Sequence, residues 1–176
     1  RNLNNLLETI LEWSIIQKNK ISLEPESVYL KKEVEKIIQL FKISLHEKNI
    51  TVDNRIKEDQ FVNIDLNILH TLVRNFISNA IKFSRNNGRV VVNSKIKNSD
   101  LELSVEDNGV GMNPQTLKKI FTNSLNTHSR GTKNKLGSGL GLLICRELVE
   151  KIEGKISAKS TKNQGSKFIV SVPLSN

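Results

Sequence analysis

The chain of 176 residues is poor in cysteine and in aromatic side chains. Because Cys145 is the only cysteine, no disulfide can form within the chain, and its apolar neighbours predict a small core residue in a protein of a reducing compartment. Aromatic residues make up 5% of the chain, and they do not alternate with basic residues as they do on a surface that stacks nucleobases. A disulfide-stabilised scaffold is thereby excluded, and nucleic-acid binding is disfavoured.

Long apolar runs are missing as well. No stretch approaches the roughly 18 consecutive apolar residues of a membrane-spanning helix, and no signal-peptide pattern opens the chain. The first residue is Arg1 rather than Met, so we expect a fragment of a longer protein, with any membrane anchor outside it. What the chain does have is basic charge: 27 Lys and Arg against 18 Asp and Glu give a net charge of +9, which favours anionic partners.

The N-terminal part of the chain predicts two helices. Apolar residues recur at helical spacing over Leu3–Lys18, and because a helix of this length is marginal alone, we expect it to pair with an upstream helix or with a second chain. The segment Ile21–Ser27 breaks the pattern, since Pro25 disfavours helix before it. Helical spacing then resumes from Leu30 to Leu45 and predicts a second helix.

Alternating and helical patterns follow one another in the rest of the chain, and Asp65 and Asn113–Pro114 are typical helix starts. The polar, aperiodic stretch 122–138 predicts a mobile loop. Strands that neighbour each other in sequence, with helices between them, predict an α+β sandwich with helices on one face. The expected elements are a strand at Ile50–Val52, a helix at Leu66–Phe83, strands at Gly88–Ile96 and Leu101–Glu106, helices at Pro114–Phe121 and Leu140–Ile152, and a final hairpin of Lys155–Thr161 and Lys167–Val172.

Two asparagines and a lysine lie together on the predicted helix Leu66–Phe83. At about 100° per residue, Asn75, Asn79 and Lys82 fall just beside its apolar arc. Asparagine competes for backbone hydrogen bonds and is a mediocre helix former, so this pair needs partners. Two interpretations are open: the amides bond neighbouring loops, or the oxygen of Asn79 ligates Mg²⁺ while Lys82 balances phosphate charge.

Two glycine-rich stretches follow in order. In Asp107–Gly111, the glycines let the backbone approach a flat ligand, and a carboxylate at the end of a strand can accept a hydrogen bond from an exocyclic amine such as that of adenine. The alternative is an ordinary turn with a surface aspartate. Gly137–Leu142 runs into the predicted helix at Leu140, and a glycine-rich helix start offers N–H groups to phosphate.

The second glycine stretch matches neither of the two best-known phosphate loops. It does not follow a strand, which argues against a Rossmann fingerprint, and it lacks the Gly-Lys-Ser/Thr of a Walker loop. The basic residues before it either form a solvated face or neutralise phosphate charge: His128, Arg130, Lys133 and Lys135.

Taken jointly and in this order, the motifs resemble the ATP-binding catalytic domain of sensor histidine kinases, which shares its nucleotide fold with DNA gyrase B, Hsp90 and MutL. The resemblance covers the chain from about Val28 to Leu174. It implies a two-layer α/β sandwich of the Bergerat type, with a mixed sheet and a preceding N-terminal helix. Its motifs are the N box at Asn75–Ser84, the first G box at Asp107–Gly111, the F box at Ile120–Phe121, the second G box at Gly137–Leu142 and a closing strand motif at Gly165–Phe168.

The resemblance also implies roles for single residues. Asp107 would bond the adenine amine, Asn79 would ligate Mg²⁺, and Lys82 would face the phosphates of ATP. The stretch 122–138 would be the ATP lid. Asn75, Asn79 and Lys82 would be the catalytic residues. The implied ATP-binding set is Asn75, Asn79, Lys82, Phe83, Asp107, Gly109, Gly111, Phe121, Arg130, Lys133, Gly137, Gly139, Leu140, Gly141 and Leu142.

For the whole protein, the resemblance implies a protein-histidine kinase of a two-component system. Residues 1–20 look like the second helix of a dimerisation and phosphoacceptor hairpin, which would give a homodimer; 21–27 would be a linker and 28–176 the ATP-binding domain. The implied protein partner is a response regulator or receiver domain, and nucleic acid is not a partner. The kinase portion would lie in the cytoplasm, with membrane contact only through regions outside this chain.

Asn75 separates the branches of this superfamily. Gyrase-like, Hsp90-like and MutL-like ATPases carry at this place a Glu that activates water, whereas Asn cannot accept a proton at neutral pH, so we expect transfer rather than hydrolysis. His46–Asn49 begins like the phosphoacceptor box but lacks its Pro, so we expect the acceptor histidine outside this chain. The alternative function is a non-catalytic ATP-binding or dimerisation module derived from a histidine kinase.

Overall fold

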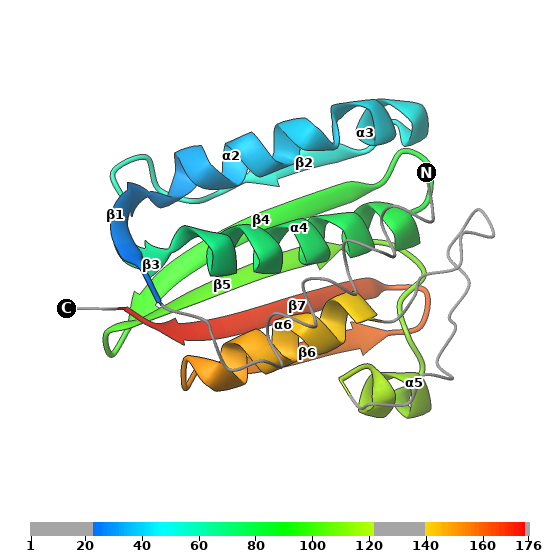
Figure 1. The fold of residues 1–176 in the computed structure, drawn as a ribbon. Helices are drawn as coiled ribbons and strands as arrows, with labels where there is room; N and C mark the ends of the chain where they lie inside the picture. The colour runs from blue at the N-terminus through cyan, green and yellow to red at the C-terminus, as the bar shows by residue number, and fades with distance from the viewer. Residues whose placement is uncertain (1–22, 122–139, 175–176) are drawn as a thin grey trace.

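The computed structural model describes residues 23–121 and 140–174. One sheet of five strands runs through these residues, and helices cover one of its faces, as the sequence predicts (Figure 1). The helix predicted over Leu3–Lys18 and the loop predicted over 122–138 lie outside the described residues. The order of the strands in the sheet is β2 (Thr51–Asn54), β4 (Arg89–Lys97), β5 (Asp100–Asp107), β7 (Gly165–Pro173) and β6 (Lys155–Thr161).

The sheet is mixed, as expected. Strand β2 lies parallel to β4, whereas the other neighbouring strands are antiparallel. The predicted hairpin joins β4 to β5 through Asn98 and Ser99, which both have positive φ, the backbone conformation that tight hairpin turns need.

Three helices pack side by side on the sheet: α2 (Leu30–Leu40), α4 (Leu66–Phe83) and α6 (Leu140–Lys151), with α4 between the other two (Figure 1). The short α5 (Pro114–Lys119) lies next to β6. Both predicted caps are present: the Asp65 carboxylate accepts a hydrogen bond from the Ile68 N–H at 3.1 Å, and Asn113 accepts one from the Thr116 N–H at 2.7 Å. Local side chains therefore fix where α4 and α5 begin.

The hydrophobic core fills the space between the sheet and the helices. The apolar face of α4 is buried, with no core side chain more than 6% exposed, and Phe76 stacks on Phe168 of β7 with ring centroids 5.6 Å apart. Cys145 on α6 is fully buried, which confirms its predicted place in the core. The strands contribute every second residue to this core: Val90, Val92, Leu101, Leu103, Val105, Phe168, Val170 and Val172.

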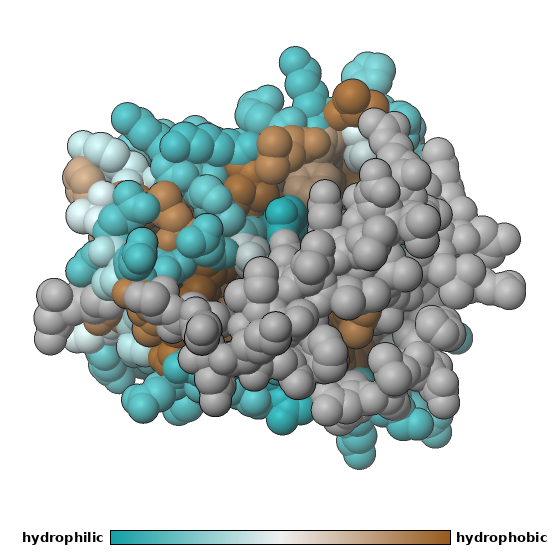
Figure 2. Space-filling model, viewed as in Figure 1, coloured by the Kyte–Doolittle hydropathy of each residue, from teal (hydrophilic) through white to brown (hydrophobic). Residues whose placement is uncertain are grey.

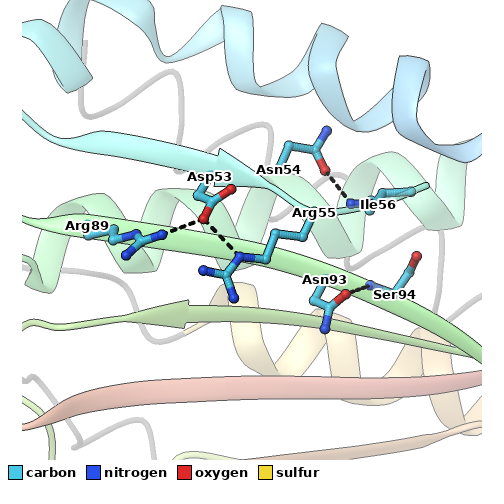
Figure 3. Close-up of polar contacts among 7 residues, drawn as sticks. All are labelled: Asp53, Asn54, Arg55, Ile56, Arg89, Asn93 and Ser94. Atoms are coloured by element: carbon cyan, nitrogen blue, oxygen red, sulfur yellow. Dashed lines mark hydrogen bonds and ion pairs between the residues drawn. The ribbon is translucent and has the colours of Figure 1, made fainter. Parts of the chain in front are cut away.

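The opposite face of the sheet carries polar and charged side chains instead. Asp53 on β2 accepts hydrogen bonds from Arg89 and, at 2.8 Å, from Arg55 Nε (Figure 3). Opposite charges on neighbouring strands stabilise an exposed sheet face modestly. Two further ion pairs join strands across this face: Lys95 with Glu102 and Lys167 with Glu106.

The single helix predicted from Leu30 to Leu45 is two helices in the structure. Helix α2 ends at Leu40, and α3 (Lys42–Lys48) begins after Phe41, whose φ of −100° and ψ of 7° interrupt the helical backbone. The apolar spacing does not reveal this break because Phe41 and Leu45 still pack against the same core.

One small sheet was not predicted. Strand β1 (Pro25–Tyr29) pairs antiparallel with β3 (Phe61–Asp65), and β1 overlaps the segment 21–27 that was expected to be a linker. Both strands are five residues long, and β1 starts with Pro25 and offers only Val28 to the core. Such a strand is stabilised by its partner rather than by its own pattern, so sequence periodicity does not detect it.

The described surface on the helix side is largely hydrophilic, with apolar side chains grouped over α2 and α3 (Figure 2). Leu40 and Ile43, on either side of the break at Phe41, are each 74% exposed. Within 23–121 and 140–174, no helix has both the length and the apolar character needed to cross a membrane.

Candidate functional site

Helix α4 carries the two asparagines and the lysine predicted to form a site. Asn75, Asn79 and Lys82 are all half-buried and lie beside the apolar face of α4, as their spacing predicts. The Asn75 side chain donates a hydrogen bond from Nδ2 to the Thr71 carbonyl, one turn earlier in the same helix, at 2.9 Å. The amide nitrogen of Asn75 therefore has a hydrogen-bond partner within α4 itself.

The oxygen of Asn75 faces the start of α6. A Cβ atom on Gly141 would lie 2.2 Å from Asn75 Oδ1, so the absence of a side chain at this position lets α6 approach α4 so closely. Leu140 and Leu142, the predicted neighbours of Gly141 in the site, are half-buried in the first turn of α6. The contact joins the asparagine motif to the end of the second glycine stretch.

Asp107 is a buried residue and not a surface turn. It ends β5 on the helix-covered face of the sheet and is only 4% exposed, and its Oδ1 accepts a hydrogen bond from the Gly109 N–H at 2.8 Å. Burial raises the pKa of Asp107 to about 6, against the opposing effect of backbone hydrogen bonds from Gly109 and Ser166. A carboxyl group of this kind can serve a ligand that brings its own hydrogen-bond donor.

The first glycine stretch lies directly against the last turn of α4. The Val110 N–H donates to the Phe83 carbonyl at 3.1 Å, and a Cβ on Gly109 would lie 2.2 Å from the same oxygen. The hydrogen bond between Val110 and Phe83 thus links the segment that contains Asp107 to the turn of α4 that contains Lys82. This contact brings together two predicted motifs that are distant in sequence.

The turn between β6 and β7 fixes the far side of the same glycine stretch. Gly111 has a φ of +59°, and a Cβ there would lie 2.0 Å from the Thr161 carbonyl oxygen. The Asn163 N–H donates to the Val110 carbonyl at 2.7 Å. Gly165, with a φ of +96°, approaches the Asp107 carbonyl so closely that a Cβ would lie 1.9 Å from its oxygen. The sequence motif at Gly165–Phe168 hints at a role for this turn, but not at its contact with the glycine stretch.

Lys82 lies in a partly dry environment. Burial lowers the pKa of its ammonium group, and its Nζ lies 4.9 Å from the centroid of the Phe83 ring. A half-buried ammonium interacts more strongly with an anion than an exposed one, because less water screens it.

Phe121 is held at the edge of the site by a residue that the sequence did not point to. Arg146 on α6 donates from Nη1 to the Phe121 carbonyl at 2.7 Å and from Nε to Glu150 at 2.6 Å. No motif marks Arg146, because its partner is far away in sequence. Four predicted site residues lie outside the described part of the chain: Arg130, Lys133, Gly137 and Gly139.

A metal ion at this place would need ligands other than a carboxylate cluster. In the described part of the chain, no group of three or more His, Cys, Asp or Glu side chains could hold a metal ion. Among the side-chain oxygens on α4, the amide oxygen of Asn79 is the predicted ligand.

Comparison with known proteins gives a family match over this site. The model of the family described as histidine kinase-, DNA gyrase B-, and HSP90-like ATPase matches residues 64–176, well over half of the chain. The autoinducer 2 sensor kinase/phosphatase LuxQ of Vibrio vulnificus is 31% identical over 177 residues, which cover 96% of this chain and 20% of LuxQ. The signal transduction histidine-protein kinase BarA of Escherichia coli K12 is 29% identical over 180 residues, which cover 96% of this chain and 19% of BarA. The chain thus spans about a fifth of the length of these relatives.

Solved structures agree with the family match. The catalytic domain of the histidine kinase ThkA superposes with a TM-score of 0.71 at 27% identity, covering 85% of this chain and 95% of that one. Full-length ShkA in complex with AMPPNP has the same fold, with a TM-score of 0.86 at 24% identity over 99% of this chain and 36% of that one. By its sequence, its fold and the arrangement of its motifs, the chain belongs to the histidine kinase-, DNA gyrase B- and HSP90-like ATPase family, and its relatives include the sensor kinase/phosphatase LuxQ and the histidine-protein kinase BarA.

Proposed function

We propose that this chain binds ATP with Mg²⁺ and transfers the γ-phosphoryl group to a histidine outside this chain, as the catalytic part of a two-component sensor kinase. The observation that carries the proposal is the backbone contact between Val110 and Phe83, which holds the buried Asp107 next to the asparagine helix α4. A base-binding carboxyl group and a phosphate-binding helix are thereby combined in one site.

Asp107 is the group that would recognise adenine. In its ionised form it can only accept hydrogen bonds, and the exocyclic amine of adenine is a donor, whereas guanine presents a carbonyl oxygen at the same place. Ligand binding in a buried site makes this discrimination strong, since an unpaired polar group there is costly. We therefore expect a strong preference for ATP over GTP.

Asn79 and Lys82 would serve the phosphates. Mg²⁺ binds hard oxygen ligands and usually keeps several waters and substrate phosphates, so a single amide oxygen from Asn79 fits its needs without a carboxylate cluster. When bound, the ion neutralises charge on the phosphates. Lys82, one turn further along α4, would add a positive charge in a partly dry place, and positioning with charge neutralisation is the main requirement of phosphoryl transfer.

Asn75 would favour transfer over hydrolysis. Its Nδ2 donates to the Thr71 carbonyl, and an amide cannot take a proton from water at neutral pH. At this position the site therefore has no residue that activates water. Hydrolysis of bound ATP would then be slow, and the phosphoryl group would be transferred to a protein acceptor.

The acceptor histidine is expected elsewhere in the full protein. His46 lies on α3 within the ATP-binding domain, and His70 on α4 bonds Glu33 Oε2 at 3.1 Å. We propose that residues 1–20 belong to a dimerisation hairpin and that 21–27, whose last three residues belong to β1, connect it to the domain. We also propose that the kinase works in the cytoplasm, where a lone buried cysteine stays reduced.

A response regulator is the proposed recipient of the phosphoryl group. ThkA, at 25% identity and a TM-score of 0.72, has been solved in complex with the response regulator protein TrrA. The likeness to ThkA in that complex extends over 99% of the present chain and 49% of the ThkA chain.

The test is a titration with a fluorescent ATP analogue, with and without Mg²⁺, followed by a measurement of ATP hydrolysis. We expect Mg²⁺-dependent binding that ATP reverses and GTP does not, together with slow hydrolysis. Rapid steady-state hydrolysis would instead assign the chain to the ATPase branch of the family. Binding without transfer to a dimerisation hairpin supplied from a related kinase would favour the non-catalytic module.

A further inference from the structure

A buried lysine holds the end of the helix that carries the site. Lys48, the last residue of α3, is 9% exposed, and its ammonium group donates three hydrogen bonds to backbone carbonyls. The three acceptors belong to the end of α4: Ile81 O at 2.6 Å, Lys82 O at 3.0 Å and Ser84 O at 2.9 Å. A lysine ammonium has three N–H donors, enough for all three of these bonds.

The end of α4 needs such a partner. After Phe83 the chain leaves the helix in an extended conformation, since Ser84 has a φ of −67° and a ψ of 149°. The carbonyls of the last turn of a helix have no partner within the helix, and the partial negative charge there favours a cation. Lys48 supplies both the donors and the charge, from a different element.

The position of Lys48 is itself fixed by backbone contacts. The Asn87 N–H donates to the Lys48 carbonyl at 2.8 Å, and the Thr51 N–H donates to the Gly88 carbonyl at 3.0 Å. The Asn49 side chain bonds that of Asn87 at 2.6 Å. The connection that follows α4 thus wraps around the end of α3, so Lys48 cannot move independently of it.

The same turn of α4 faces the first glycine stretch on its other side. The Phe83 carbonyl accepts from the Val110 N–H at 3.1 Å and leaves no space for a Cβ on Gly109. Lys48 and Val110 therefore hold consecutive carbonyls of one turn, which contains Lys82. A shift of this turn would move Lys82 relative to Asp107.

We propose that Lys48 is a positioning residue of the nucleotide site: its ammonium group holds the last turn of α4 so that Lys82 and the first glycine stretch keep the spacing that ATP requires. This inference rests on the proposed function, because it concerns the same site. Lys48 acts through backbone carbonyls and does not touch the nucleotide itself.

The experiment compares Lys48→Met with Lys31→Met. Methionine keeps the length of the side chain and removes the ammonium; Lys31, on α2, loses the same charge and an ion pair with Glu58. We expect the affinity for a fluorescent ATP analogue with Mg²⁺ to fall at least about tenfold in Lys48→Met, the scale of a lost charged hydrogen bond, and to stay within about twofold in Lys31→Met. Lys48→Arg, which restores a cationic donor, is expected to recover part of the affinity.

A second control distinguishes a general loss of stability from a local effect of Lys48 on the site. Val34→Ala opens a cavity under α2, where Val34 is fully buried, and all titrations are made well below the unfolding temperature of each variant. We expect Val34→Ala to keep its affinity, and we expect the backbone amide NMR signals of Phe83, Ser84 and Val110 to move in Lys48→Met alone.

Two results would overturn the proposal. One is an affinity of Lys48→Met within about twofold of the wild type, and the other is an equal loss in Val34→Ala. In both cases the wild type binds ATP and the proposed function stands. A wild-type protein that binds no nucleotide would overturn both the proposed function and the role of Lys48.

Discussion

The two ends of the site are built differently. At its carboxylate end (Asp107–Gly111 with Gly165), the closest approach at each glycine is to backbone: a Cβ on Gly109, Gly111 or Gly165 would lie within 2.2 Å of a carbonyl oxygen. At its amide end (Asn75, Asn79 and Lys82), the close approach is to a side chain, because a Cβ on Gly141 would meet the oxygen of Asn75.

This difference separates a fixed part of the site from an adjustable one. Carbonyl groups in a sheet and a helix end cannot move without breaking their own hydrogen bonds, whereas an asparagine side chain can rotate. We infer that the carboxylate end keeps its shape when the ligand changes, while the amide end adapts. Substitutions at the two ends should therefore differ in kind as well as in size.

The largest effect is expected for Gly165→Ala. A φ of +96° is unfavourable for alanine, and its Cβ would lie 1.9 Å from the Asp107 carbonyl oxygen, so the β6–β7 turn must leave the glycine stretch. We expect the free energy of unfolding to fall by about 3 kcal/mol or more, measured by urea unfolding. Gln164→Ala, at an exposed neighbouring position, should change it by less than about 0.5 kcal/mol. A Gly165→Ala protein of normal stability would show that this end is not rigid.

Asp107→Asn should act on binding. It keeps the shape of the side chain but removes the charge of the carboxylate that we propose accepts a hydrogen bond from the adenine amine, so we expect the affinity for ATP to fall on the order of 100-fold, as for a lost charged hydrogen bond. Glu106→Gln removes the same charge from the exposed neighbour, which pairs with Lys167 on the open face. The control should bind ATP as the wild type does, and equal losses in both variants would mean that net charge, not Asp107, governs binding.

The same substitution should change how stability depends on pH. The pKa of Asp107 is about 6 in the folded protein, above its ordinary value of 3.8. Between these values the unfolded chain has released the proton and the folded protein keeps it, so stability falls as pH rises, by on the order of 3 kcal/mol in total. Asp107→Asn lacks this loss. Its free energy of unfolding without nucleotide should therefore rise relative to the wild type between about pH 4 and pH 7. A constant difference would contradict the buried, weakly acidic state of Asp107.

Sequence patterns predicted the parts of the fold that depend on neighbours in the chain. The start of α4 at Asp65 is a local cap, and the core strands alternate in a way that periodicity detects. The end of α4 depends instead on Lys48, 34 residues before Lys82, and strand β1 depends on β3. These contacts form only in the tertiary structure, so no local sequence pattern predicts them.

The site shows the same division. The residue types at Asn75, Asn79, Lys82 and Asp107 are the basis of the proposed chemistry, because amides, an amine and a carboxylate together suit a nucleotide with a metal ion. That Asp107 is buried, and that the turn at Gly165 presses against it, follows only from the tertiary contacts. The motifs thus lead to a proposal for what the site binds, but they do not show how rigidly it is built.

The smallest effect is expected at the amide end, in Gly141→Ala. Its Cβ would lie 2.2 Å from Asn75 Oδ1 and 3.2 Å from Cγ, so the Asn75 side chain must rotate and its bond to the Thr71 carbonyl is lost. We expect a loss of about 1 kcal/mol in stability and an ATP affinity reduced by a few-fold. If the side chain is the obstacle, the stability cost should largely vanish when Asn75 is also replaced by Ala. A double-mutant cycle with unfolding free energies measures this, because independent sites would add within about 0.5 kcal/mol. Additive losses of stability would mean that the Asn75 side chain is not what obstructs a Cβ at position 141. The amide end would then not differ from the carboxylate end in this respect.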